Sequence, residues 1–263
     1  GTMTSGGLLG DGEGGALQML RCENQGAMQG SISGGLVGHM GTSSASTVDF
    51  TDCKNSGAVT HTAKSAKIGG LLGLGNGDLT NCVNTGDLSG ETVGGLVGSG
   101  DGAVIDCRGK AALTTCAIAG GLRGIASKMD EYLIENCAVE LDVHVEDGSY
   151  VGGMVGCGYG YTTVKNCNVD FSMDGNCELA GGLFGTVHGA LNAMDCFADV
   201  KADTGDIFGG LLGSVTSKSM KANNCIAQVE IENAVRDVGG LLGQGNFQIT
   251  QCYAVGQIAS DAD

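Results

Sequence analysis

The sequence predicts an all-β fold, a single-stranded parallel β-solenoid (right-handed β-helix) of about nine rungs. The first observation behind this prediction is a five-residue phrase, Gly-Gly-Leu-aliphatic-Gly, that recurs every 25 to 35 residues. Its nine first glycines are Gly6, Gly34, Gly69, Gly94, Gly120, Gly152, Gly181, Gly209 and Gly239. A fixed phrase at this period is typical of stacked repeats, in which each unit contacts only its neighbours. We therefore expect one repeat domain over residues 1–263.

The second observation is a cysteine in each interval, with an apolar residue three positions before it. These cysteines are Cys22, Cys53, Cys82, Cys107, Cys137, Cys167, Cys196, Cys225 and Cys252. Beyond the cysteine every second residue tends to be small or apolar, as in Cys137, Val139 and Leu141, which is the period of a strand. Two inward positions three residues apart break that period, so we expect a bend just before each cysteine.

The third observation is the composition, with 50 glycines, no proline and 42% hydrophobic residues. So much glycine can indicate a disordered linker, but here the glycines stand at fixed places beside aliphatic residues. We therefore expect tight corners, two or three strands per rung and almost no helix. One helical turn is expected at Ser127-Lys128-Met129-Asp130.

Taken in chain order, the rungs are of two kinds. Cys22, Cys53 and Cys82 each begin the pattern Cys-x-Asn-x-Gly. Asn and Gly tolerate left-handed backbone conformations, so the first three rungs should bend after the cysteine. From Cys137 onward the same places are apolar, as in Val139, and these rungs should run straight and longer. The cross-section should therefore change near Cys107.

Strand alternation predicts which face each place of the phrase occupies. The leucine at place three and the cysteine should point into the core. Place four and the residue before the phrase should then point outward and form an apolar stripe. Arg123, the one charged residue at place four, fits an outward position. The stripe would be too large to leave bare on a soluble monomer. Either the chain's own variable corners, a second chain or another part of a longer parent protein must cover it, and we favour the chain's own segments.

The cysteines are expected to be thiols rather than a disulfide framework. Neighbouring rungs would bring their Cα atoms to about 4.8 Å, within disulfide range, but stacked side chains point the same way. We therefore expect a buried ladder of small hydrophobic thiols. Cys116, Cys157 and Cys177 lie off the ladder, and their state stays open. The chain has no Cys-x-x-Cys pair, which weakens zinc and thioredoxin-type interpretations.

The charge excludes some partners. The net charge is −16, with 13 Lys plus Arg against 29 Asp plus Glu. A nucleic-acid partner is not expected, because sequence-independent binding needs a basic face, and an anionic membrane surface is disfavoured for the same reason. No apolar run approaches the length needed to span a bilayer, so this chain should not insert into a membrane. No cofactor is expected.

The clearest candidate for chemistry is a wall of acidic residues on the outer face of the later rungs. Three, five and seven residues after the cysteine stand Glu140, Asp170, Asp199, Gln228, Asp142, Ser172, Lys201, Glu230, His144, Asp174, Asp203 and Glu232. Neighbouring like charges repel unless they are screened or bind a cation. The weak candidates for a cation site are Asp170, Asp199, Asp174, Asp203 and Glu232. The alternatives are a solvated face that keeps the body soluble and a retaining glycosidase, whose two carboxyls lie about 5 Å apart.

A second candidate is a group of tyrosines. Tyr132, Tyr150, Tyr159 and Tyr161 fall within thirty residues of one another. Tyrosine offers rigid amphipathic contact area, so they are weak candidates for binding a sugar or a protein. The alternative is packing against neighbouring corners. The four histidines have no partner at metal-ligand spacing.

The repeated phrase resembles a known motif. Gly94-Gly95-Leu96-Val97-Gly98, together with Asn81-Cys82-Val83-Asn84-Thr85-Gly86, resembles the GLUG motif. That motif occurs outside the catalytic domain in bacterial IgA-specific metallopeptidases and in large surface proteins of gut bacteria. Arg123 and Met154 depart from it. The resemblance covers nearly the whole chain and implies no catalytic residue, and the helix motif His-Glu-x-x-His is absent.

The resemblance implies an extracellular, cell-surface location. The expected function is a non-catalytic repeat module that serves as a stalk, spacer or adhesive surface of a bacterial surface protein. The alternative is a carbohydrate-active enzyme, a glycoside hydrolase or polysaccharide lyase, that uses the acidic outer face. Expected partners are a host glycan, a host or bacterial surface protein, and flanking domains of a longer parent chain.

Overall fold

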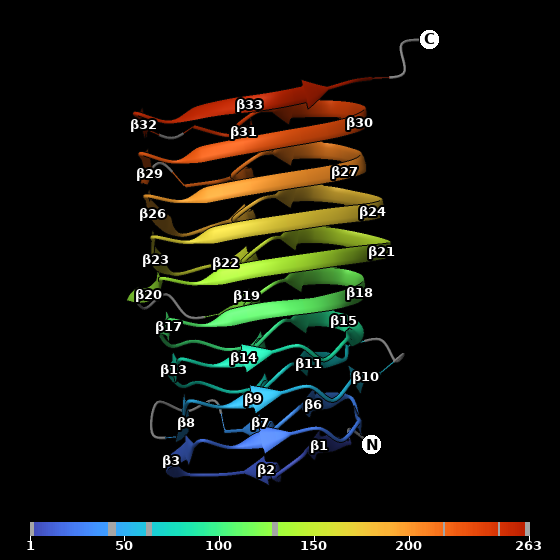
Figure 1. The fold of residues 1–263 in the computed structure, drawn as a ribbon, viewed down its shortest axis with the longest axis vertical. Helices are drawn as coiled ribbons and strands as arrows, with labels where there is room; N and C mark the ends of the chain where they lie inside the picture. Colours follow the sequence, from blue (N-terminus) through green and yellow to red (C-terminus); the bar gives the residue numbers. More distant parts are fainter. Residues whose placement is uncertain are drawn as a thin grey trace.

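A computed structural model describes residues 3–41, 46–61, 65–127, 131–217, 219–246 and 248–260. The described chain is all β and contains no helix. All strand pairs are parallel, and they stack as a solenoid (Figure 1). In the front face of Figure 1 the strands run left to right while the chain rises, which is the right-handed sense. The predicted fold is therefore confirmed. The helical turn expected at Ser127–Asp130 falls largely on residues 128–130, outside the described residues.

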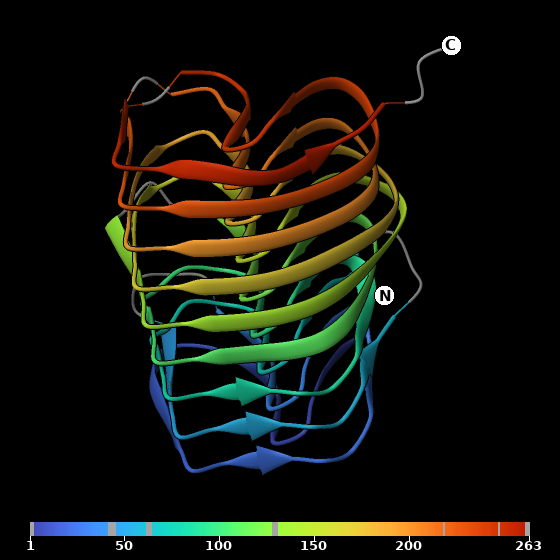
Figure 2. The same ribbon diagram turned by 45° about the horizontal axis from the view of Figure 1, so that its top comes forward.

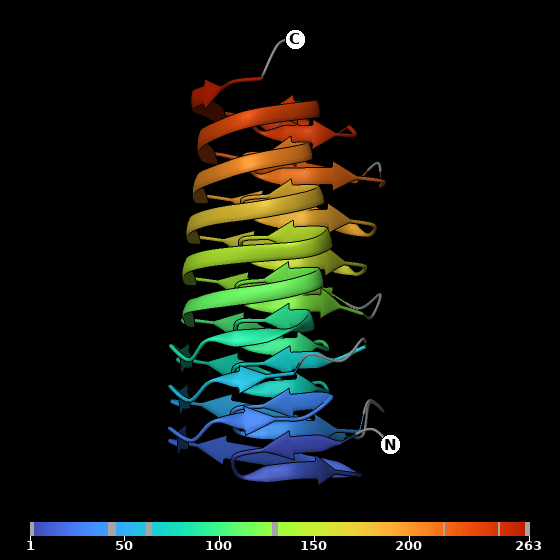
Figure 3. The ribbon, with the colours of Figure 1, turned by 90° about the vertical axis from the view of Figure 1, so that its right-hand side faces the viewer.

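Three sheets run the length of the solenoid, and Figure 3 shows their strands stacked edge to edge. The main path of sheet A contains β1 (Thr4–Gly6), β6 (Ile32–Gly34), β11 (Lys67–Gly69), β15 (Leu88–Gly94), β18 (Arg108–Gly120), β21 (Ala138–Gly152), β24 (Asn168–Gly181), β27 (Phe197–Gly209), β30 (Ile226–Gly239) and β33 (Tyr253–Ile258). Its short side strands are β4 (Glu23–Asn24), β5 (Met28–Gln29), β9 (Lys54–Asn55), β10 (Val59–Thr60) and β14 (Val83–Asn84).

Sheets B and C each have nine strands, in agreement with the nine copies of the phrase. Sheet B contains β2 (Leu9–Gly12), β7 (Val37–Met40), β12 (Leu72–Leu74), β16 (Val97–Ser99), β19 (Arg123–Ala126), β22 (Val155–Gly158), β25 (Phe184–Val187), β28 (Leu212–Val215) and β31 (Leu242–Gln244). Sheet C contains β3 (Gly15–Leu20), β8 (Ser46–Thr51), β13 (Leu79–Thr80), β17 (Val104–Ile105), β20 (Glu131–Glu135), β23 (Tyr161–Lys165), β26 (Ala190–Met194), β29 (Met220–Asn223) and β32 (Gln248–Thr250).

The phrase forms a sharp inward fold between sheets A and B, visible as the notch in the upper edge of Figure 2. Its glycines are needed because the two arms of the fold pack backbone against backbone. A Cβ added at Gly152 would lie 2.0 Å from the carbonyl oxygen of Val155, and one at Gly156 would lie 2.7 Å from that of Ala119. At the tip of the fold, a Cβ at Gly153 would lie 2.4 Å from Val169 of the long strand opposite.

This inward fold overturns the prediction of an outward apolar stripe. Val155 at place four and Val151 before the phrase are both 0% exposed. The residues that face the gap between the arms are glycines, so the apolar residues of both arms turn into the interior instead. The expectation that the chain itself covers these residues is confirmed. The cover is the body of the solenoid rather than its variable corners.

Arg123 was predicted to point outward, and that prediction is wrong. Its side chain is 1% exposed, because β19 turns place four into the core as in every inner rung. Its Nη2 donates a hydrogen bond to the carbonyl oxygen of Gly102 at 3.0 Å. Its guanidinium carbon lies 5.4 Å from the centre of the Tyr132 ring, a cation–π distance. Burial lowers the pKa of Arg123.

The predicted change in cross-section is confirmed. In the first three rungs Asn24, Asn55 and Asn84 point inward and form a ladder. The amide nitrogen of each donates to the side-chain oxygen of the next at 2.7 Å, from Asn24 to Asn55 and from Asn55 to Asn84. Each also donates to the glycine carbonyl two residues later, which closes the bend. From β18 onward, one strand of 13 to 15 residues replaces these short pieces in each inner rung.

The bend expected before each ladder cysteine is also confirmed. The residue before it has a left-handed φ of 51° to 55° in all nine rungs. The thiol Sγ then lies 3.1 to 3.6 Å from the carbonyl oxygen two residues upstream. The inner seven of these cysteines are buried as predicted, whereas Cys22 and Cys252 in the end rungs are half-buried. Cysteine suits this corner because it is small, apolar and a weak donor.

Candidate functional site

The acidic wall exists in the register that the sequence predicts. Along sheet A, Glu140 pairs with Asp170, and Asp170 pairs with Asp199. Glu140 and Asp170 are exposed, and Asp199 is half-buried. Asp174 and Asp203 lie where the pairing of β24 and β27 becomes irregular. Glu232 is exposed on β30. The wall is therefore a face of carboxylates on neighbouring strands, which lie about 4.8 Å apart.

Several members of this wall are engaged with neighbours on adjacent rungs. The Nζ of Lys110 lies 2.6 Å from a carboxylate oxygen of Glu140, and Nδ1 of His144 lies 2.9 Å from Asp174. The hydroxyl of Ser172 donates to Asp142. Within the described residues no three His, Cys, Asp or Glu side chains gather closely enough to hold a metal ion. These pairs favour a solvated face over a cation site.

The structure separates the four tyrosines. Tyr132 is 5% exposed and packs in the core against Arg123. Tyr150 is half-buried at the end of β21, whereas Tyr159 and Tyr161 are 41% and 42% exposed. Tyr132 is thus a packing residue, and only the other three reach the surface.

One of the surface tyrosines belongs to an aromatic pair at the corner between sheets B and C. The ring of Tyr159 stacks on that of His188, with centroids 4.8 Å apart and planes at 21°. The Nδ1 of His188 lies 3.2 Å from the hydroxyl of Thr216 on the next rung. Behind them, burial raises the pKa of Cys157, and a hydrogen bond with Tyr159 opposes that rise. Cys177 is also buried, and its thiol donates to the carbonyl of Leu179. The side chain of Cys116 lies outside the described residues.

Sequence reasoning missed a groove that follows the corner between sheets C and A in the first rungs. At this corner the cysteine points inward, so the residues on either side of it point outward in two columns. Together they enclose a concavity of about 780 Å³. It is lined by Arg21, Cys22, Glu23, Asp52, Lys54, Asn81, Val83, Asp106, Arg108 and Asn136.

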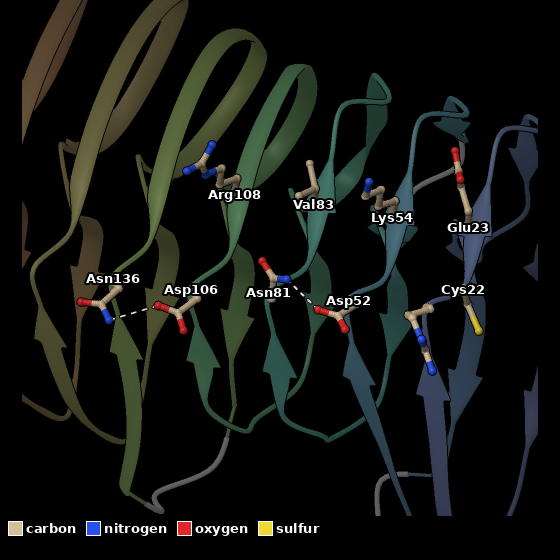
Figure 4. A pocket seen from close by; sticks show the side chains of 10 residues that line it. Cys22, Glu23, Asp52, Lys54, Asn81, Val83, Asp106, Arg108 and Asn136 are labelled. Carbon is tan, nitrogen blue, oxygen red and sulfur yellow. Dashed lines mark hydrogen bonds between the residues drawn. The ribbon is translucent and has the colours of Figure 1, made fainter.

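Figure 4 shows the two columns as separate rows, with Lys54, Val83 and Arg108 in one and Asp52, Asn81, Asp106 and Asn136 in the other. Strand pairing fixes the first row, because Lys54 pairs with Val83 and Val83 pairs with Arg108. The residues of the second row stand at left-handed turns, and these turns fix their positions. A sequence signal for this groove exists, since a polar residue precedes every ladder cysteine.

The acids of the groove already accept side-chain hydrogen bonds, Glu23 from Gln25 and the two aspartates from groove asparagines. The side-chain amide of Asn81 donates to Asp52 at 2.6 Å, and that of Asn136 donates to Asp106 at 3.1 Å. The basic residues of the groove, in contrast, have no such partners among its acids. Within the described chain the ion pairs lie elsewhere, so Arg21, Lys54 and Arg108 have no acidic partner within 4.0 Å. The groove therefore presents three uncommitted cations on a strongly acidic protein.

A scan of protein-family models, a search of curated proteins and a search of solved structures each give no match to this chain. The described part of the chain contains no helix long and apolar enough to cross a membrane.

Proposed function

We propose that this chain is a non-catalytic repeat module of a bacterial cell-surface protein, with a stiff body that holds an adhesive side surface away from its attachment. The observation that carries the proposal is the continuity of the three sheets, which stay parallel through successive rungs from β1 to β33. Nine stacked rungs correspond to a rod of about 40 Å at the usual strand spacing. The resemblance to the GLUG motif of bacterial surface proteins supports the extracellular location.

The surface of the rod supports a binding role over a catalytic one. On the acidic wall, Lys110, His144 and Ser172 neutralise or hydrogen-bond neighbouring carboxylates, which leaves those groups poorly prepared for acid–base chemistry. A retaining glycosidase needs two carboxyls in different protonation states, whereas the wall repeats similar exposed carboxylates from rung to rung. The groove at the corner between sheets C and A has both basic and acidic side chains, and it offers a better ligand surface than the acidic wall.

The test separates binding from hydrolysis. The purified chain is screened against arrays of glycans and surface proteins, and is also incubated with a panel of polysaccharides. Saturable binding without release of reducing ends or unsaturated products supports the proposal. Release of products that the double variant Asp170→Asn/Asp199→Asn abolishes would replace it with the carbohydrate-active enzyme.

A further inference from the structure

We propose that the corner groove binds an acidic glycan chain that lies along the solenoid axis, with Lys54 and Arg108 holding its carboxylates. This inference rests on the proposed function and names the ligand class and the site. Asp52 and Asp106 accept hydrogen bonds from Asn81 and Asn136, and Glu23 accepts one from Gln25. Arg21, Lys54 and Arg108 have no acidic partner within 4.0 Å among the described residues.

The spacing of the cations selects an extended polymer. Lys54 and Arg108 stand in one column with Val83 between them, so they are two rungs apart. Two strand spacings are about 10 Å. A chain that lies along the groove would meet these two cations at that separation. Two linked pyranose rings span a similar length, so a glycan with one carboxylate per disaccharide matches this repeat.

The rest of the lining favours a sugar over an acidic peptide. The carboxylates of Asp52 and Asp106 and the amides of Asn81 and Asn136 can exchange hydrogen bonds with sugar hydroxyls. A peptide would gain most by adding a strand to a free sheet edge. No free edge is available at the middle of this groove, because β9 pairs with β4 and β14, and β14 pairs with β18. Val83 is the one large apolar side chain of the lining.

The net charge of −16 opposes the approach of a polyanion. The groove itself has as many acids as bases, three of each, so most of the opposing charge lies outside it. Charges farther apart than about 8 Å are largely screened at physiological ionic strength, whereas a contact between a base and a carboxylate in the groove survives. Binding should therefore be weakest at very low salt, where the repulsion of the whole protein is unscreened.

The test is calorimetric titration of the full chain with a hyaluronan octasaccharide, an acidic glycan with one carboxylate per disaccharide. The comparison ligands are its carboxyl-reduced form, a polygalacturonate oligomer and octaglutamate. The test variant is Lys54→Ser/Arg108→Ser. The matched control is Lys201→Ser/Lys221→Ser, which removes the same charge from two exposed positions elsewhere. Thermal melts of both variants check that the fold is kept.

We expect the acidic glycans to bind, the reduced form to bind at least about tenfold more weakly, and the test variant to lose about tenfold or more per base removed, as for charge-assisted hydrogen bonds. The control should lose less than about twofold. The inference is overturned if neither acidic glycan binds at about 1 mM, if the reduced form or octaglutamate binds equally well, or if both variants lose the same affinity. If the test variant binds a glycan as well as the wild type does, the proposed function as a binding module is kept, and the groove is not the binding site.

Discussion

The first three rungs and the later rungs close the same corner with different chemistry. In the first three, buried asparagines form a hydrogen-bonded ladder, and each one folds the chain back onto its own glycine carbonyl. In the later rungs the equivalent column is apolar, with Val139 and Val169 in register. The comparison shows that the glycines at the tip of the inward fold can pack against either an asparagine or a valine of the opposite strand. A Cβ at Gly35 would strike Asn55 at 2.4 Å, and one at Gly153 would strike Val169 at 2.4 Å.

Substitutions at this corner should lower the stability of the two regions for different reasons. An apolar column loses contacts and leaves a cavity, so its losses follow the volume removed. A polar ladder loses hydrogen bonds and leaves buried groups without partners, so its losses depend on how many partners remain. The predictions below use this difference, and they run from the largest expected effect to the smallest.

The largest loss is expected from the apolar column of the later rungs. Phe171 is 0% exposed and pairs with Leu141 and Val200. Phe171→Ala should lower the free energy of unfolding by about 3–5 kcal/mol, measured by urea denaturation. The exposed neighbour Lys201→Ala should change it by less than about 0.5 kcal/mol. A loss below about 1 kcal/mol for Phe171→Ala would mean that the corner repacks, contrary to the close packing described here.

A smaller loss is expected from one step of the asparagine ladder. Asn55→Val removes the acceptor of Asn24 and the donor to Asn84. The variant loses three buried hydrogen bonds, two along the ladder and one to Gly57. At about 0.5–1.5 kcal/mol each, the free energy of unfolding should fall by about 2–4 kcal/mol in urea denaturation. The triple variant Asn24→Val/Asn55→Val/Asn84→Val should lose less than three times this amount, because neighbouring asparagines share the ladder bonds.

The reciprocal substitution sharpens the same comparison. Val169→Asn puts a lone amide where the neighbouring rungs supply only Val139 and Ala198, so it should also destabilise by about 1–3 kcal/mol. If Val169→Asn is neutral, the apolar column is not what defines the later rungs, and the ladder needs no asparagine neighbours.

The strand pattern could be predicted from sequence because each signal was local and repeated. Alternation after Cys137 and the Asn-x-Gly pattern after Cys22 each report the conformation of a few neighbouring residues. The inward fold could not be predicted in the same way. Alternation states that Val155 and Leu9 lie on the face opposite to their neighbours, but it does not state what covers that face. The cover depends on glycines of two arms meeting across the gap, which is a tertiary contact.

The same limit explains the errors and omissions at the surface. Arg123 was assigned outward from strand alternation, and its charge fitted that position. The position is nevertheless buried, and the guanidinium donates to the carbonyl of Gly102 and lies over the ring of Tyr132. The acidic wall was predictable because strand register alone places Asp170 beside Asp199. The polar residue before each ladder cysteine was visible in the sequence, but the groove itself was missed, because it depends on side chains of left-handed turns that pair between rungs.

A pH effect of intermediate size is expected from thiols that belong to the later rungs. Burial raises the pKa of Cys177 to about 12. The folded state therefore keeps this thiol neutral, while the unfolded chain ionises near pH 9. Stability from this group is complete below about pH 9 and falls as the pH rises toward 12, by at most about 1.4 kcal/mol per pH unit.

The measurement is urea denaturation under reducing conditions at pH 8 and pH 10.5. The wild type should lose more stability between these values than Cys177→Ala does, with a difference of up to about 2 kcal/mol. Equal losses in the two proteins would mean that Cys177 is solvated in the fold. The comparison of variants is needed because tyrosines and other thiols also titrate in this range.

The smallest effect is expected from calcium, because carboxylates on the outer face of the later rungs already pair with side chains on adjacent rungs. Lys110 already pairs with Glu140, and His144 hydrogen-bonds Asp174. The described residues gather no group of three metal ligands. Calcium at millimolar concentration should therefore leave the melting temperature of the chain nearly unchanged. A site that binds the folded state with a Kd 100-fold below the added calcium would instead add about 2.7 kcal/mol.

The double variant Asp170→Asn/Asp199→Asn is the matched test. A calcium-dependent rise of that size in the wild type, lost in the double variant, would show that this part of the wall is a cation site. A rise that persists in the variant would place the cation elsewhere on the rod.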